Sequence, residues 1–378
     1  MNGGLQAMQT AQQLWSRSTG ARDLADRARK QPVIIRALRR FRPAGAVGAI
    51  RKAGLEGRCA LAGIEHVWRE TLGDPRVCIA IVDGPVDLSH PCLAGAQLSV
   101  LGAAGVSCRG HGACSHGTHV ASLIFAGHGS GPLGGVAPGC RGIVVSIFRD
   151  DSSLEGGVRP CGQQELARAI EAAVGAGAQV INISAGEPDI SAGEPGGIGA
   201  ADRRLRDAID LCHRRGVLVV AAAGNEGCDC VHVPAALPMV LSVGAHDADG
   251  SPSAASNFGS AYRRQGLVAP GAAILGAAPG GRFVKRSGTS FAAPLVAGLA
   301  GLLLSARLKQ RGHLKASDVR DARDALLRSA SICDLNDRRD CRRLLVGRAN
   351  PVAALNDYTR GGTPDGGIDQ RSAIVVKH

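Results

Sequence analysis

Four short segments of the chain carry residue types that can take part in acyl-transfer chemistry. They are residues 79–87 (IAIVDGPVD), 115–122 (SHGTHVAS), 221–227 (AAAGNEG) and 286–294 (RSGTSFAAP). Each lies where an apolar strand would end or a helix would begin, which is where α/β sheets place their active sites. Together they supply an acid, an imidazole, a carboxamide and a hydroxyl, which are the components of one acyl-transfer site.

Each segment contributes one candidate catalytic residue. Asp83 ends an apolar strand, where its carboxylate can orient a histidine. His116 begins a predicted helix and is the candidate general base. Asn225 follows a strand and a glycine, and its amide can donate to a developing oxyanion. Ser290 begins an apolar helix, whose dipole and free N–H groups can share the load of an oxyanion.

Each of these segments, taken alone, has a plainer explanation. The Asp-Gly-Pro sequence after Val82 is also ordinary turn chemistry, and Ser290 could act only as a helix N-cap. His116 and His119 lie three residues apart and could bind a metal. The four segments together are harder to explain as caps and turns, so we interpret them as one catalytic site.

The elements that must position these residues follow from the apolar pattern. Five runs are apolar nearly throughout, as strands covered on both faces are: residues 77–82, 143–148, 180–183, 217–222 and 240–243. Helical patterns cover residues 163–174, 201–213 with Asp202 near its start, and 316–329. Residues 291–304 are apolar all round, which predicts a helix buried in a core and too short to span a bilayer. The alternation predicts an α/β fold with a mostly parallel sheet covered by helices on both faces.

The chain order Asp, His, Ser, with HGTHVAS, AAAGNEG and SGTSFAAP, resembles the subtilisin family (peptidase S8) over about residues 64–305. The resemblance implies the subtilisin-like three-layer sandwich and a serine-type endopeptidase. It implies that Asp83 orients and stabilises His116. His116 would then take the hydroxyl proton of Ser290. The side chain of Asn225, with the backbone N–H of Ser290, would stabilise the tetrahedral oxyanion.

The resemblance also implies a substrate site. Its residues are Ser184, Ala185, Gly186, Ala223, Gly224 and His232. Residues 184–186 resemble the strand that pairs with an extended peptide. Residues 231–234 align with the floor of the pocket for the residue before the cut, where subtilisins commonly have glycine and this chain has His232. An imidazole there predicts cleavage after small residues such as Ser, Ala or Gly. The alternative is that His232 turns into the core and leaves the pocket open.

A narrower resemblance is to the cyanobactin maturation proteases of the PatA/PatG type. It rests on Asp83-Gly-Pro-Val-Asp and on residues 138–142 and 227–238. Those enzymes process ribosomally made precursor peptides, either by removing a leader or by cutting a C-terminal signal and macrocyclising. The macrocyclase carries a helical insertion between its Asp and His motifs. Asp83 and His116 are only 33 residues apart here, which favours the hydrolytic, PatA-like role.

Three other functions remain open from the sequence. One is a general degradative subtilisin, which would tolerate many sequences, and another is a macrocyclising transpeptidase. The third, outside enzymes, is a peptide-binding pseudoprotease that keeps the groove without turnover. Competent residues at all four catalytic positions argue against the pseudoprotease.

Charge divides the chain into three expected parts. Residues 1–58 hold 12 Lys and Arg against three acids and so carry +9 of the formal net charge of +12. We expect a basic N-terminal extension there, a catalytic domain over 59–357, and a disordered tail over 358–378. The near balance of the remainder excludes a nucleic-acid function for the domain. With no signal peptide or long apolar stretch visible, a cytoplasmic protein without a membrane span is expected.

The chain contains 12 cysteines and 11 histidines. Cys108, His111, Cys114 and His116 form one cluster and Cys228-Asp-Cys230 a second, but neither has the paired spacing of structural zinc sites. We therefore expect no metal and no cofactor. Free thiols are the default expectation, with Cys333 and Cys341 as the disulfide partners if any form. No acidic loop is specific enough to assign calcium.

Overall fold

The structure is a computed structural model. It describes residues 59–102, 108, 112–129, 131–151, 153, 157–188, 201–332 and 341–360. The expected basic extension over residues 1–58 lies outside this part of the chain, as does everything after residue 360.

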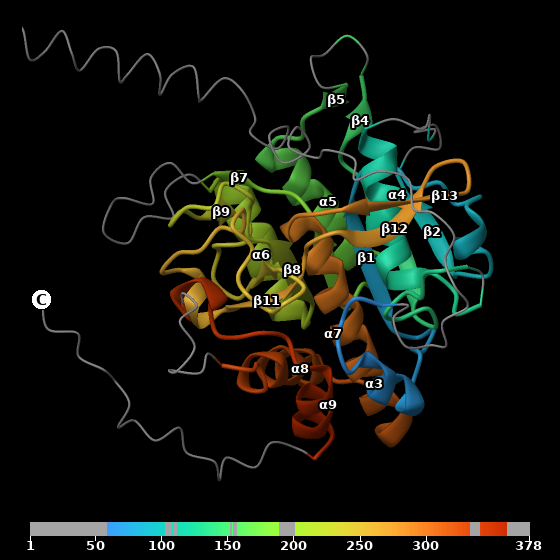
Figure 1. Ribbon diagram of the computed structural model, residues 1–378, viewed down its shortest axis with the longest axis vertical. Helices are drawn as coiled ribbons and strands as arrows, with labels where there is room; N and C mark the ends of the chain where they lie inside the picture. Colours follow the sequence, from blue (N-terminus) through green and yellow to red (C-terminus); the bar gives the residue numbers. More distant parts are fainter. Residues whose placement is uncertain are drawn as a thin grey trace, which may run out of the picture.

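A seven-stranded parallel sheet forms the centre of the molecule (Figure 1). In spatial order its strands are β11 (Gly266–Pro270), β10 (Leu241–His246), β8 (Leu218–Ala222), β6 (Val180–Ile183), β1 (Cys78–Asp83), β3 (Arg141–Ser146) and β2 (Leu98–Leu101). β1, β6 and β8 are buried along their whole lengths, as apolar runs covered on both faces should be. The α/β fold with a covered parallel sheet is confirmed.

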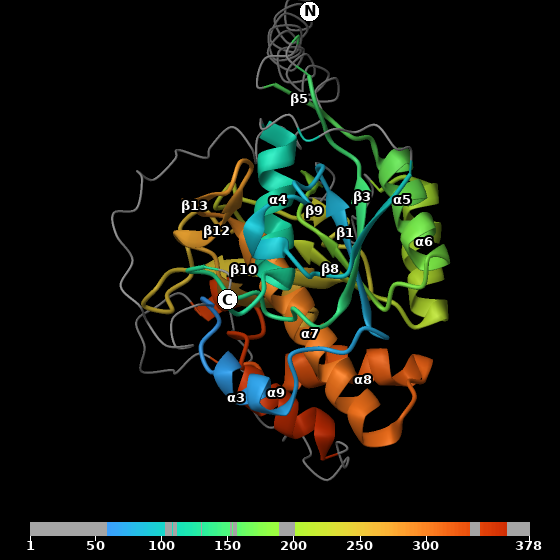
Figure 2. The same ribbon diagram turned by 90° about the vertical axis from the view of Figure 1, so that its right-hand side faces the viewer.

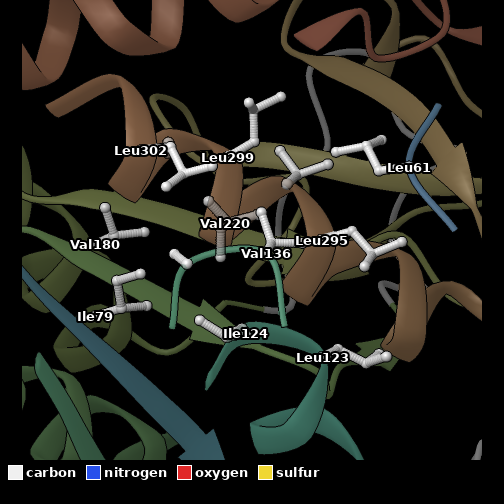
Figure 3. Packing of buried hydrophobic residues seen from close by; sticks show 14 of the residues in the cluster. Leu61, Ile79, Leu123, Ile124, Val136, Val180, Val220, Leu295, Leu299 and Leu302 are labelled. Atoms are coloured by element: carbon white, nitrogen blue, oxygen red, sulfur yellow. The ribbon is translucent and has the colours of Figure 1, made fainter. Parts of the chain in front are cut away.

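Two hydrophobic layers hold the sheet between helices (Figure 2). Ile79 and Ile81 of β1 pack toward α4 (Gly112–Phe125) and α7 (Thr289–Arg311), where Leu295, Leu299 and Leu302 project (Figure 3). The alternate residues of β1 face α5 (Gln163–Gly175) and α6 (Arg203–Arg215). This division follows from the alternation of side chains along a strand.

Helix α7 runs through the first of these layers. It is 23 residues long, and its residues from Thr289 to Leu308 are buried. It is the one described helix long and apolar enough to cross a membrane, and the window that meets this test is entirely buried inside the protein. The sequence pattern predicts a shorter helix over 291–304. The structure extends it because the last turns contain basic residues, which interrupt the apolar run without ending the helix.

Smaller elements complete the fold. The helices are α3 (Ile64–Glu70), α8 (Ala316–Arg328) and α9 (Pro351–Thr359), with 3-10 turns η1 (Pro91–Leu93), η2 (Tyr262–Arg264) and η3 (Cys341–Leu344). Three antiparallel pairs are β4 (Arg149–Asp150) with β5 (Val158–Arg159), β7 (Glu187–Pro188) with β9 (His232–Val233), and β12 (Ile274–Ala278) with β13 (Arg282–Arg286).

The C-terminal boundary differs from the expected one. Tyr358, which the sequence placed at the start of a tail, lies in α9 with its ring buried. Its hydroxyl donates to the carbonyl of Asp318 at 3.0 Å, and the guanidinium of Arg307 lies 4.2 Å from its ring centroid. Helix α9, which packs against α8, therefore continues past the position at which the sequence predicts the tail to begin.

The expectation of free thiols is wrong at both cysteine clusters. Disulfides join Cys108 to Cys114 and Cys228 to Cys230, and Cys341 is also disulfide-bonded. Cys333, its expected partner, lies outside the described residues. The cytoplasmic location expected from the sequence stays a prediction.

Candidate active site

Asp83 and His116 form a buried pair at the carboxyl edge of the sheet. Nδ1 of His116 donates to Oδ1 of Asp83 at 2.8 Å, and the same oxygen accepts the backbone N–H of Gly84 at 2.6 Å. The side chain of Asp83 is fully buried and that of His116 is 3% exposed. A buried carboxylate on Nδ1 fixes the imidazole tautomer in which Nε2 carries no proton and can act as the base.

Glycines make this approach of β1 and α4 possible. A Cβ atom added at Gly84 would overlap the carbonyl of Ala113 in α4, and one added at Gly117 would overlap the carbonyl of Gly84. Both obstacles are backbone atoms, which cannot move aside cheaply. The Gly84 position therefore accounts physically for the departure from the Asp-Ser/Thr-Gly sequence usual in subtilisins.

Ser290 lies in the first turn of α7, and the residue after it packs against the ring of His116. Its side chain is buried, and its Oγ donates to the carbonyl of Ser184 at 3.1 Å. The following residue, Phe291, packs its ring 5.3 Å from the ring of His116 and 4.5 Å from that of His119. These contacts hold the start of α7 against α4, and so bring the hydroxyl and the imidazole to the same edge of the sheet.

Asn225 is locked by the start of the same helix. Its Oδ1 accepts the backbone N–H of Thr289 at 2.9 Å and the hydroxyl of Thr289 at 3.2 Å. Because the carboxamide oxygen is committed to α7, the Nδ2 group is the donor left for a ligand. The site therefore combines an Asn donor with the helix N-terminus beside Ser290.

A buried asparagine fixes the loop that carries Asn225. Oδ1 of Asn257 accepts the backbone N–H groups of Glu226 and Gly227 at 2.8 and 2.9 Å, and its Nδ2 donates to Oε2 of Glu226 at 2.7 Å. Gly224, in the same loop, has a positive φ of 106°. A side chain there would be strained whatever the space around it.

The residues expected to bind substrate lie around His232. A Cβ atom added at Gly186 would lie 3.2 Å from His232, and one added at Gly224 would lie 2.9 Å from Cε1 of its ring. The imidazole is therefore wedged between the 184–186 segment and the 223–224 segment. It is 4% exposed and does not turn away from these two walls.

The carboxylate of Glu226 lies against this imidazole. Nε2 of His232 lies 2.9 Å from Oε2 of Glu226. Burial would raise the pKa of Glu226, but the contacts with His232 and Asn257 outweigh it and lower this pKa to about 2. Glu226 is therefore a carboxylate at neutral pH, and the floor of the candidate pocket carries a polar, charge-assisted pair.

Four residues of the site escaped the sequence analysis: Asn257, Thr289, Tyr262 and Arg286. Tyr262 accepts the backbone N–H of His232 at 2.6 Å and donates to the carbonyl of Ala223 at 3.0 Å, which ties two pocket segments together. One signal was available, because the chain contains only two tyrosines and a buried tyrosine needs a partner for its hydroxyl. Asn257 gave no comparable signal in the sequence, because an asparagine among small residues is typical of a turn.

The histidine pair considered for metal binding is divided between two environments. His116 bonds Asp83, whereas His119 is fully buried against Phe291 and beneath Gly276 of β12. Within the described ranges no group of three or more His, Cys, Asp or Glu side chains is arranged to hold a metal ion. The donor geometry gives no support to a metal site here.

A family model described as the subtilase family matches residues 74–361. The thermophilic serine proteinase of Bacillus sp. (strain AK1) is 33% identical over 242 residues, which are 64% of this chain and 55% of that protein. Subtilisin E of Bacillus subtilis (strain 168) is 34% identical over 238 residues, or 61% of this chain and 55% of that protein. The chain thus spans about half the length of these curated relatives.

Solved structures are also similar. The prenylagaramide maturation protease PagA is 45% identical with a TM-score of 0.70, covering 79% of this chain and 99% of that one. The patellamide maturation protease PatA is 47% identical with a TM-score of 0.67, covering 76% and 99%. The PatG macrocyclase in complex with peptide is 28% identical with a TM-score of 0.69, covering 82% and 99%.

Proposed function

Since the chain belongs to the subtilase family, we propose that it is a serine endopeptidase that cleaves precursor peptides. The observation that carries this proposal is the buried bond from His116 to Asp83, together with the packing of His116 on the start of α7, where Ser290 lies. An oriented imidazole base, a serine and a carboxamide donor held in place together are the components of acyl transfer through a covalent ester.

Each group has a defined part in the proposed reaction. Ser290 Oγ attacks the peptide carbonyl while its proton passes to Nε2 of His116, and Asp83 stabilises the imidazolium that forms. Nδ2 of Asn225 and the backbone N–H of Ser290 donate to the oxyanion. The imidazolium then gives the proton to the leaving amine. Water, deprotonated by the same base, releases the acyl group.

A peptide would bind along residues 184–186 by adding a strand beside them. The carbonyl of Ser184, which accepts the hydroxyl of Ser290 in this structure, is one acceptor for such a peptide. A peptide N–H that took this acceptor would free the hydroxyl to donate to His116. Substrate binding and activation of Ser290 would then be coupled.

Two observations favour precursor peptides as the substrates. PagA and PatA, both maturation proteases by name, are 45% and 47% identical to this chain, whereas the PatG macrocyclase is 28% identical. Between Asp83 and His116 the described residues form η1, β2 and the start of α4, and no inserted helix pair is among them. Both points favour hydrolysis over macrocyclisation.

His232 supports a narrow pocket for the residue before the cut. Its imidazole occupies the space between Gly186 and Gly224 and is tied to Glu226. A large aromatic or branched side chain would have to displace this packed pair. We therefore propose cleavage after Ser, Ala or Gly.

The experiment is to incubate the protein with linear precursor-like peptides and weigh the products by mass spectrometry. Hydrolysis gives two linear fragments whose masses add up to that of the peptide plus one water, because the acyl fragment gains OH and the amine fragment gains H. A product that lacks this water would show transpeptidation, and intact peptide would contradict proteolysis. A Ser290→Ala protein serves as the control, because it keeps the fold of α7 and lacks the nucleophile.

A further inference from the structure

Arg286 places a positive charge beside the catalytic pair. It is the last residue of β13, four positions before Ser290. Its Nη2 donates to Oγ of Ser115 at 2.6 Å, and Ser115 directly precedes His116. One guanidinium therefore links the segment that carries the proposed nucleophile to the segment that carries the proposed base.

No carboxylate of the described residues lies within ion-pair distance of this guanidinium. Other arginines of the protein behave differently, since Arg76, Arg204 and Arg328 each lie 2.8 to 3.1 Å from an acidic oxygen. Asp83 is the nearby acid that acts on Arg286, but its Oδ1 is occupied by His116 and by the N–H of Gly84. The hydrogen-bond partner of Arg286 among the described residues is the neutral hydroxyl of Ser115.

This environment leaves the cation poorly compensated. Burial lowers the pKa of Arg286, with Asp83 acting in the opposite direction. The group still stays protonated, because a guanidinium does not lose its proton in proteins. Arg286 is half-buried, so its charge is partly desolvated, and a ligand carboxylate would offset that cost through charge-assisted hydrogen bonds.

The position of β13 indicates which part of a bound peptide would lie near the guanidinium of Arg286. The β12–β13 hairpin packs on α4, with Gly276 against His119. The β7–β9 ribbon with His232 lies across β8 and α7 from that hairpin (Figure 1). A chain that enters along residues 184–186 and crosses Ser290 would leave toward the hairpin.

We propose that Arg286, oriented by Ser115, binds the carboxylate of an Asp or Glu side chain on the leaving-group side of the cut bond. The proposal rests on the proposed endopeptidase activity and adds a substrate class to it. Arg286 would select precursor peptides with an acidic residue at the first or second position after the cut.

The test uses two sets of four internally quenched peptides, all built on one small-residue cleavage sequence. They carry Glu, Gln, Lys or Ala, first at the first and then at the second position after the cut. The readout is the ratio of kcat/KM for Glu over Gln, which cancels general effects on folding or catalysis. The expected ratio for the wild type is about tenfold at one of the two positions, as a charge-assisted hydrogen bond provides.

Variants assign the preference to the residue. Arg286→Gln should bring the Glu to Gln ratio to about one, and Arg286→Glu should reverse it in favour of Lys. Lys285→Gln is the matched control, because it removes a positive charge one residue away on the other face of β13. It should leave the ratio unchanged. If Arg286→Gln fails to fold, Ser115→Ala should lower the ratio by loosening the guanidinium.

A wild-type ratio near one at both positions would overturn the proposal. A Glu to Gln ratio that stays at the wild-type value in Arg286→Gln would also overturn it. If Arg286→Gln does not fold, an unchanged ratio in Ser115→Ala would have the same meaning. If the protein cleaves none of the peptides and its serine does not react with a fluorophosphonate, the endopeptidase proposal itself fails. Cleavage without an acid preference contradicts the role of Arg286 alone.

Discussion

The two ends of the Asn225 carboxamide have separate roles. Its oxygen accepts the N–H of Thr289, so the donor for an oxyanion is held by the helix that carries Ser290. Asn225→Ala should lower kcat by about 100- to 1000-fold, the usual loss for one oxyanion donor. Asn225→Asp keeps the acceptor for Thr289 but lacks the donor, so it should lose at least as much. Steady-state kinetics on a chromogenic peptide decide this. A wild-type kcat in either variant would contradict the role.

His232 should set the size of the residue accepted before the cut. His232→Gly should broaden cleavage from Ser, Ala and Gly to Phe and Leu, because it removes the ring between Gly186 and Gly224. Glu226→Gln is the control that removes the charge and keeps the ring, and it should leave the size limit in place. Peptide-library profiling measures both. Strong wild-type preference for Phe or Leu would refute the narrow pocket.

His119 should make stability depend on pH. Burial, together with the nearby Arg286 and His116, lowers its pKa well below the usual value of 6.5. The unfolded chain takes up this proton below about pH 6.5 and the folded protein does not, so stability is full above that pH and falls as pH drops. The slope is about 1.4 kcal/mol per pH unit for one proton.

The measurement for His119 is urea unfolding between pH 5 and 8. The difference in the free energy of unfolding between wild type and His119→Asn should change with that slope in the acidic half of the range. The difference isolates His119 from the other buried histidines. A difference that stays constant with pH would contradict the buried neutral imidazole.

At the scale of elements, the catalytic pair depends on the contact between β1 and α4. A methyl group at Gly117 would overlap the carbonyls of Gly84 and Pro85. Gly117→Ala should therefore separate His116 from Asp83, with a loss of kcat on the order of 100-fold and of about 1–3 kcal/mol in stability.

Gly129→Ala, in the loop after the same helix, is the control for this change. A Cβ atom there would have nothing within 4 Å, so activity and melting temperature should both be kept. Kinetics and thermal unfolding of the two variants give the answer. Equal activity of Gly117→Ala and wild type would show that the close approach is not needed.

The sequence predicted the central strands because their environment is uniform. β1, β3, β6, β8 and β10 all begin and end within a few residues of the expected runs, since burial on both faces demands continuous apolar residues. Edge strand β2 has two exposed residues, and β12–β13 lies over a helix, so neither shows that pattern. Edge strand β11 was also missed although four of its five residues are buried, because its apolar run is short and lies between Gly266 and Pro270.

The same contrast separates the site residues that were foreseen from those that were missed. Asp83, His116, Asn225 and Ser290 stand at the ends of predicted elements, where position alone suggests chemistry. Asn257 bonds Glu226, which lies more than 30 residues away in the sequence. Arg286 bonds Ser115, which lies more than 170 residues away. Such pairings arise only from the packing of the hairpin and loops on the sheet.

At the scale of the whole molecule, the fold gathers chemistry from four chain segments at one edge of a parallel sheet (Figure 1). Parallel strands place their carboxyl ends together, so β1, β6 and β8 deliver Asp83, Ser184 and the Asn225 loop to that edge. Helix α7, buried along its length, delivers Ser290 from the other layer. The site is therefore a property of the complete domain.

The central claim is that Ser290 is a nucleophile activated by His116 and Asp83. Reaction with a fluorophosphonate, followed by digestion and mass spectrometry, tests it most directly, because the reagent marks only an activated serine. We predict one phosphonyl group on the peptide that contains Ser290. Labelling should be absent in Ser290→Ala and at least about 1000-fold slower in His116→Ala, since the triad acts as one unit. Labelling at another residue, or equal labelling of the His116→Ala protein, would contradict the account.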